Sequence, residues 1–100
     1  MTFKIKIEPD ARLDIQEAID WYNNQQKGLG KKFHTAVLSR IESLIKSPHF
    51  EMRYDNVHCL PLNKYPFMIH FTIDEAQKMV IIRAIFHTSL NPDKWQKRWL

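Results

Sequence analysis

Cysteine and long apolar runs are scarce in this sequence. Cys59 is the only cysteine among the 100 residues, so no intramolecular disulfide can form, which is typical of a protein from a reducing cytosol. No apolar run approaches the roughly 18 residues that a membrane-spanning helix requires. Residues 1–8 alternate charged and apolar side chains, unlike a signal peptide. We therefore expect a cytoplasmic protein that makes no membrane contact.

The few glycines and the placement of the histidines limit the possible chemistry. Gly28 and Gly30 fall in one expected turn, so the chain has no glycine-rich phosphate-binding loop. None of the five histidines is spaced as in a metal site, and the neighbours His58 and Cys59 would point to opposite faces of a strand. No Ser-His-Asp or Cys-His arrangement is signalled locally. We expect neither a metal nor another cofactor.

Length and composition are those of one folded domain. The chain has 44% hydrophobic and 26% charged residues, so we expect a single domain over residues 1–100. The net charge of +4 is unevenly distributed: residues 1–22 carry five acids against three bases, and residues 76–100 carry five bases against Asp93 alone. A basic end favours an anionic partner, either nucleic acid or an acidic protein. The alternative is a solvated basic face with no specific partner.

The hydrophobic pattern predicts an α+β fold. Residues 3–7 alternate as in a half-buried strand, and apolar residues then recur twice at helical spacing on either side of the glycine turn. From residue 53 the period changes to two, with a turn at 74–77. The expected elements are a strand at 3–7, an antiparallel helical hairpin over 10–25 and 29–46, a three-stranded antiparallel meander over 57–62, 67–73 and 79–86, and a short helix beginning near Asp93.

The strand patterns also predict how the sheet is arranged. The segment 79–86 is almost wholly apolar, which indicates burial on both faces and hence a central position. Pro61 indicates a sheet edge or a bulge, because proline has no N–H to donate. We expect the helices on one face of the sheet. The other face, with its basic rim, would then be an exposed binding surface.

One set of side chains on the predicted sheet has catalytic potential. His70 and Arg83 lie on adjacent strands, and His87 ends the last one. A histidine acts as a general acid or base near neutral pH and an arginine holds a phosphate, so the three residues would support metal-free RNA cleavage through the 2′-hydroxyl. Alternatively, His70 only faces solvent, and His87 only ties the strand end to the C-terminal segment.

Aromatic residues interleaved with bases are candidates for partner or target binding. The rigid segment Tyr65-Pro66-Phe67 either stacks on bases or anchors the start of a strand in the core. Trp95 and Trp99 meet nucleic acid or protein, or Trp95 closes the core, in which case Trp95→Ala costs about 3–5 kcal/mol. The candidate binding residues are Lys64, Tyr65, Lys94, Trp95, Lys97, Arg98 and Trp99.

Three segments, taken in order, form a recognisable pattern over nearly the whole chain. The first holds Ala11, Asp14, Ile15, Glu17 to Tyr22, Gln25, Gly28 to Gly30 and Phe33. The second holds Leu62 to Phe71, Ile73 and Asp74. The third holds Val80, Ala84 to Ser89, Asn91, Pro92, Trp95 and Arg98. Together these segments resemble the ParE-like toxins of the RelE/ParE superfamily, which include plasmid stabilisation proteins.

The resemblance implies the toxin of a bacterial type II toxin–antitoxin module. A cognate antitoxin would hold the toxin inactive, and operator DNA would be bound only through the antitoxin. ParE-like members inhibit DNA gyrase, and the long helical hairpin favours that subgroup. RelE-like members cut messenger RNA on the ribosome, but Phe67 stands where many carry a strand arginine, and Ser89 and Leu90 stand where another arginine often follows His87. A ribonuclease using His70, Arg83 and His87, or a degenerate member that only binds an antitoxin, are the alternatives.

Overall fold

The computed structural model describes residues 3–46, 52–54 and 56–90 of the chain. They form β1 (Lys4–Ile7), α1 (Pro9–Gln25), α2 (Leu29–Lys46), β2 (Met52–Tyr54), β3 (Val57–Pro61), β4 (Phe67–Asp74) and β5 (Met79–His87). The predicted α+β class, the first strand, both helices and the three later strands are confirmed. The helix expected near Asp93 lies outside the described residues.

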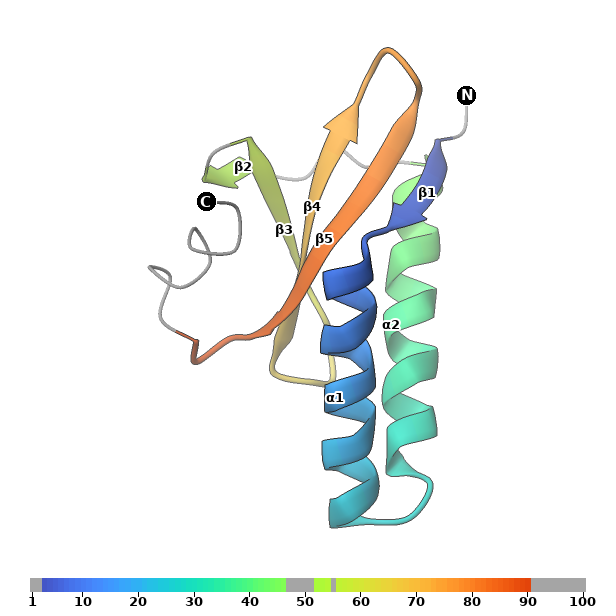
Figure 1. Ribbon diagram of the computed structural model, residues 1–100, viewed down its shortest axis with the longest axis vertical. Helices are drawn as coiled ribbons and strands as arrows, with labels where there is room; N and C mark the ends of the chain where they lie inside the picture. The colour runs from blue at the N-terminus through green and yellow to red at the C-terminus, as the bar shows by residue number, and fades with distance from the viewer. Residues whose placement is uncertain (1–2, 47–51, 55, 91–100) are drawn as a thin grey trace.

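The two helices form an antiparallel hairpin that extends past the end of the sheet (Figure 1). Pro9 opens α1, where its fixed φ suits the first helical turn. Gly28 has a φ of 89° in the turn between the helices, a conformation that glycine adopts without strain. Gly30, in the first turn of α2, lies in close contact with α1: a Cβ there would lie 2.5 Å from the carbonyl oxygen of Ile19. The sequence of this turn therefore determines how closely the helices approach.

The sheet has five strands in the order β1-β5-β4-β3-β2. The predicted antiparallel meander β3-β4-β5 forms its centre, and β1 pairs with β5 in parallel, with Lys4 opposite Met79. β2 was not predicted, because three residues are too few to show a period of two. It pairs with the start of β3, and Asn56, with a φ of 64°, lies between the two strands.

The edge position predicted for Pro61 is confirmed, whereas the central position predicted for β5 holds only for the first half of that strand. β5 lies between β1 and β4 as far as Ile82, and the middle strand of the five is β4. Pro61 pairs with Met68 of β4 at the end of β3, whereas β2 reaches only Val57 and His58. Among the described residues, no strand therefore pairs with the outer side of Pro61. The N–H that proline lacks is not needed for a strand hydrogen bond there.

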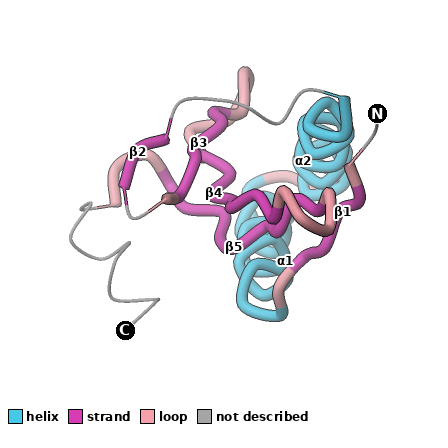
Figure 2. Tube along the Cα trace, turned by 90° about the horizontal axis from the view of Figure 1, so that it is seen from above, coloured by secondary structure: helices cyan, strands magenta, loops and turns pink. Residues whose placement is uncertain are grey.

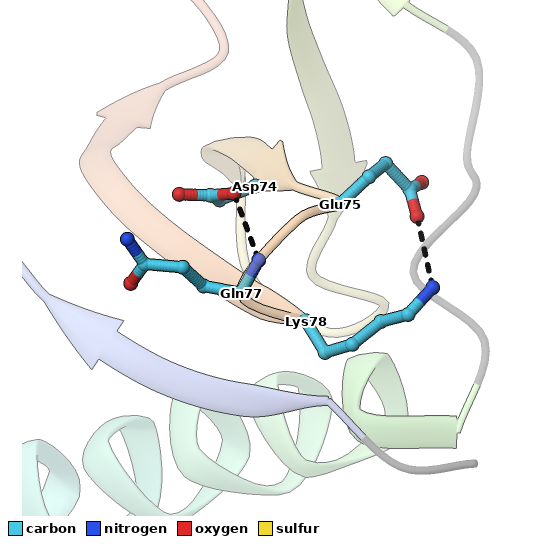
Figure 3. Close-up of polar contacts among 4 residues, drawn as sticks. All are labelled: Asp74, Glu75, Gln77 and Lys78. Atoms are coloured by element: carbon cyan, nitrogen blue, oxygen red, sulfur yellow. Dashed lines mark hydrogen bonds and ion pairs between the residues drawn. The ribbon is translucent and has the colours of Figure 1, made fainter.

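The turn between β4 and β5 is stabilised by its own side chains (Figure 3). Asp74 Oδ1 accepts a hydrogen bond from the backbone N–H of Gln77 at 3.1 Å, and Lys78 Nζ lies 3.5 Å from Glu75 Oε2. Lys78 adopts a left-handed φ of 53°, and its carbonyl oxygen accepts a hydrogen bond from Lys4 N–H at 2.8 Å. The turn thus connects the hairpin β4-β5 to β1.

One face of the sheet packs against the helices, as predicted, and Figure 2 shows α1 and α2 beside β1 and β5, away from β2. The core on this face includes Phe33, Val37 and Leu44 from α2 and Ile69, Phe71, Val80 and Ile82 from the sheet. The prediction of an exposed second face is wrong at the centre of the sheet. The residues buried there are Val57, Cys59, His70, Ala84 and Phe86.

Candidate functional site

His70 lies at the buried centre of the second sheet face. Its side chain is 0% exposed, so the expectation that it faces solvent is wrong. Its Nδ1 atom lies 3.5 Å from Cys59 Sγ on β3, and its ring contacts that of Phe86 on β5 at 4.9 Å between centroids. These contacts come from the two strands on either side of β4. A histidine in this position serves first as a packing residue of the sheet.

Arg83 occupies an irregularity in the pairing of β4 with β5. His70 pairs with Ala84 and Phe71 with Ile82, so Arg83 is the extra residue of a bulge. Its Nε donates to Thr72 Oγ1 at 3.1 Å, and its Nη1 lies 3.4 Å from Glu8 Oε1. The guanidinium thus connects β4 to the residue that precedes α1. Thr72 follows His70 by two residues on β4, so Arg83 and His70 lie toward the same face of the sheet.

His87 is exposed at the end of β5 and lies over Phe67, with ring centroids 5.1 Å apart. The backbone N–H of Ser89 donates to His87 Nδ1 at 3.0 Å, and Ser89 Oγ lies 2.7 Å from the same atom. Nδ1 is therefore the acceptor nitrogen, and the neutral ring carries its proton on Nε2. These contacts connect the strand end to the following segment, which is the alternative to a catalytic role that was considered for His87.

The three candidate catalytic residues do not converge. Residues directly opposite in an antiparallel pair share a face, so His87 shares the face of Phe67, which packs against the helical core. His70 is three residues from Phe67 along β4 and shares the opposite face with Ala84. The sheet itself separates the two imidazoles. A cleavage mechanism that needs His70 and His87 on one phosphodiester has no geometric basis in this arrangement.

Lys64 and Tyr65 line a groove between α2 and the loop that joins β3 to β4. We call it the basic groove; it has a volume of about 430 Å³ and is lined by Lys32, Thr35, Ala36, Ser39, Arg40, Leu62, Asn63, Lys64 and Tyr65. Arg40 Nε donates to the carbonyl oxygen of Pro61 at 3.2 Å, which joins α2 to the end of β3. Lys32 and Arg40 were not singled out from the sequence. The signal was present, because residues 21–41 contain no Asp or Glu.

The ring of Tyr65 belongs to an aromatic cluster under the basic groove. It makes edge contacts with Tyr22 and Phe33, each at 5.3 Å between centroids, so of the two roles considered for this segment it anchors the strand start in the core. Tyr22 stacks on Phe33 at 5.1 Å. Burial raises the pKa of Tyr22 above its ordinary value, and the nearby Tyr65 raises it further. Both rings serve as packing elements of the core.

A second groove, with a volume of about 380 Å³, lies between α1 and the end of β5. Asp14 and Glu17 give it an acidic side, and Trp21, which is 57% exposed, borders it together with His87. Asp14 Oδ2 accepts a hydrogen bond from Ile85 N–H at 3.0 Å. Trp21 was not predicted to lie at the surface. The signal was present, because Trp21 falls outside the apolar stripe of Ala11, Ile15, Ala18 and Tyr22.

The remaining candidate binding residues, Lys94, Trp95, Lys97, Arg98 and Trp99, lie outside the described residues, so their roles stay predictions. Within residues 3–46, 52–54 and 56–90, no three His, Cys, Asp or Glu side chains gather as they would around a metal ion. Neither of the two helices in these ranges is long and apolar enough to cross a membrane.

Comparison with solved structures gives the class of the fold. A chain of the chromosomal ParDE toxin–antitoxin system from P. aeruginosa superposes with a TM-score of 0.72 at 18% identity, covering 87% of this chain and 97% of that one. A mutant of the E. coli toxin RelE in the free state gives 0.72 at 11% identity, with both chains fully covered. The toxin–antitoxin complex RelBE2 from Mycobacterium tuberculosis gives 0.61 at 13% identity, covering 87% and 99%.

The fold expected from the resemblance to RelE/ParE toxins is thereby confirmed over most of the chain. No protein-family model matches the sequence. No curated protein matches it either. At these identities the likeness shows the fold, and it is shared by ParE-type and RelE-type structures alike.

Proposed function

We propose that this protein is the toxin of a type II toxin–antitoxin module, that a cognate antitoxin holds it inactive, and that it acts as a non-enzymatic inhibitor of DNA gyrase. The fold supports the first part, since the similar structures come from toxin–antitoxin systems. One observation carries the choice of target: His70 is buried on one face of the sheet and His87 is exposed on the other. Without a convergent acid–base pair, binding is a better account of toxicity than RNA cleavage.

The engagement of Arg83 supports the same choice. A phosphate-binding arginine needs donor groups that face the ligand. Here Nε is directed to Thr72 and Nη1 to Glu8 within the protein. Glu8 also places a carboxylate beside the guanidinium, and that negative charge repels a phosphodiester. The side chain therefore has a complete structural role in joining the sheet to the start of α1.

The module is tested by inducible expression in bacteria. We expect growth arrest on induction, and relief when the product of an adjacent short open reading frame is expressed together with it. Unchanged growth without any antitoxin would favour the degenerate, antitoxin-binding alternative. The target is then tested with purified protein in a gyrase supercoiling assay, in which we expect inhibition; full gyrase activity at excess protein would refute this part of the proposal.

The ribonuclease alternative rests on His87. Its ring is exposed, and Nδ1 accepts from Ser89, so Nε2 of a single histidine is available at the surface for proton transfer. It predicts new 5′ ends on cellular messenger RNA after induction, which primer extension detects. Under the gyrase proposal such ends do not appear before growth stops.

A further inference from the structure

The groove between α1 and the end of β5 runs along an open stretch of strand edge. We call it the acidic groove; Glu17 and Trp21 border it on α1, and Ile85 and His87 border it on β5. β1 pairs with β5 only as far as Ile82, so in the described ranges no strand lies beside β5 at this groove. An edge of this kind offers backbone hydrogen-bonding groups to an extended peptide.

Two backbone groups on this edge are available to a partner. Phe67, which pairs with His87, directs its carbonyl oxygen toward the β3 side, so His87 and Ile85 direct their N–H and C=O groups away from β4. Asp14 Oδ2 accepts the Ile85 N–H, and the His87 carbonyl oxygen accepts the Leu90 N–H. Within the described ranges, the Ile85 carbonyl oxygen and the His87 N–H form no hydrogen bond. One residue of a parallel strand would satisfy both groups.

The side chains at the acidic groove favour a cationic segment. Trp21 follows Glu17 by one turn of α1, so the exposed carboxylate and the exposed indole lie on the same side of the helix. A lysine or arginine is attracted by the carboxylate and binds the face of an indole. Glu17 forms no ion pair within the described residues, so a cation would break none. Residues 10–20 carry four acids against one base, in a chain whose net charge is +4.

We propose that the acidic groove is the surface with which this protein holds gyrase, and that its occupant is an extended basic segment of gyrase added to β5 as a parallel strand. This inference rests on the proposed function, because it names the surface used for the same inhibition. One residue of the segment donates to the Ile85 carbonyl oxygen and accepts from the His87 N–H. The residues before and after it point toward α1. One of them, a lysine or arginine, meets Glu17 and Trp21, and the other, an apolar residue, packs against Ala18.

Other occupants fit the acidic groove less well. The phosphates of a nucleic acid or the carboxylates of an acidic segment would meet Glu17 and Asp14, which repel them. A second copy of this chain would pair about a twofold axis, which makes the two β5 strands antiparallel. Each of two facing residues would then leave one backbone group unpaired, because Asp14 and Leu90 already bind the groups of Ile85 and His87 that it needs.

The test compares purified variants in the gyrase supercoiling assay. Glu17→Lys/Trp21→Ala changes the acidic groove. Leu38→Ala/Glu42→Lys makes a matched change on α2, where an exposed large apolar residue and an exposed acid also lie one turn apart, outside this groove. We expect the groove variant to need at least about tenfold more protein for half-maximal inhibition, and the control to stay within about twofold of the wild type.

A second variant guards against loss of folding. Glu17→Lys alone keeps the edge contact of Trp21 with Tyr22, and we expect weaker inhibition from it too, with an unchanged melting temperature. Equal inhibition by the wild type and both groove variants would overturn this inference while leaving the proposed function standing. Unchanged inhibition with loss of binding to the product of the adjacent open reading frame would also overturn it, since the occupant would then be the antitoxin. If the wild type does not inhibit gyrase, the proposed function itself fails.

Hydrogen exchange, followed by mass spectrometry, tests the strand addition directly. The His87 amide gains an acceptor when the segment binds, so we expect the peptide covering residues 85–90 to exchange at least about tenfold more slowly at that amide in the gyrase complex than in the free protein. Equal exchange at saturating gyrase, from a protein that inhibits the enzyme, would show that β5 does not pair with the target.

Discussion

At the scale of single residues, the contact between the two helices depends on Gly30. Its backbone N–H donates to Asn23 Oδ1 at 2.8 Å, and a Cβ at this position would meet the Ile19 carbonyl and the Asn23 side chain. We expect Gly30→Ala to lower the free energy of unfolding by about 1–3 kcal/mol, because backbone atoms of α1 cannot yield as a flexible side chain would. Urea denaturation measures the change. Lys31→Ala, at the next and exposed position, serves as the control and should leave stability within about 0.5 kcal/mol.

Tyr22 gives a second prediction at this scale, one of pH dependence. Burial and the neighbouring Tyr65 raise its pKa above the ordinary value of 10.0. In the folded state the phenol therefore stays protonated at a pH where the unfolded chain has ionised. Its contribution to stability is complete below pH 10 and is lost as the pH rises through the raised pKa. We expect Tyr22→Phe to flatten the fall in unfolding free energy above that pH; identical slopes for variant and wild type would contradict it.

At the scale of elements, α1 protects an edge of the sheet. β1 pairs with β5 only as far as Ile82, so in the described residues β5 has one strand neighbour from Arg83 onward. Asp14, projecting from α1, accepts the Ile85 N–H on this open side. An uncovered strand edge invites pairing with another chain, and a carboxylate over it reduces that hazard. The helix thus completes the edge where β1 ends.

Replacing Asp14 tests this arrangement. We expect Asp14→Ala to cost about 1–3 kcal/mol of unfolding free energy, because the Ile85 N–H loses its partner. Asp14→Asn keeps an acceptor oxygen and should retain most of the stability. Hydrogen exchange of the Ile85 amide, followed by NMR, should be faster in the alanine variant than in the asparagine variant. Equal protection of that amide in both would show that Asp14 does not cover the edge.

At the scale of the whole molecule, the sheet separates the residues that a ribonuclease would need together. If the protein acts by binding gyrase, the exposed His87 is dispensable for toxicity. We expect His87→Ala to keep growth arrest on induction and gyrase inhibition in vitro. The matched measurement is the melting temperature, since the variant also loses the contacts to Phe67 and Ser89. A folded His87→Ala protein without toxicity would contradict the gyrase proposal and favour RNA cleavage.

The elements with long, regular patterns could be predicted from the sequence. Helical spacing identified both helices, and alternation identified β4, because those signals extend over many residues. β2 was not predicted, because three residues show no period and because its strand conformation depends on pairing with β3. Of the candidate site residues, Lys64 and Tyr65 were found at a groove. Their neighbours Lys32 and Arg40 were missed, because on α2 alone they are ordinary surface bases.

The sequence by itself determined the class of fold, the edge position of Pro61 and the excess of basic charge. Each of these follows from a property of one segment alone: the period of its hydrophobic residues, the N–H that a proline lacks, or the number of its charges. Only the tertiary structure decided that His70 is buried and that His70 and His87 lie on opposite faces. It also decided that Arg83 faces Glu8, 75 residues away in the chain. The strand register and the bulge in β5 determine these positions. Register and bulge arise from contacts between distant segments, so no single segment of the sequence encodes them.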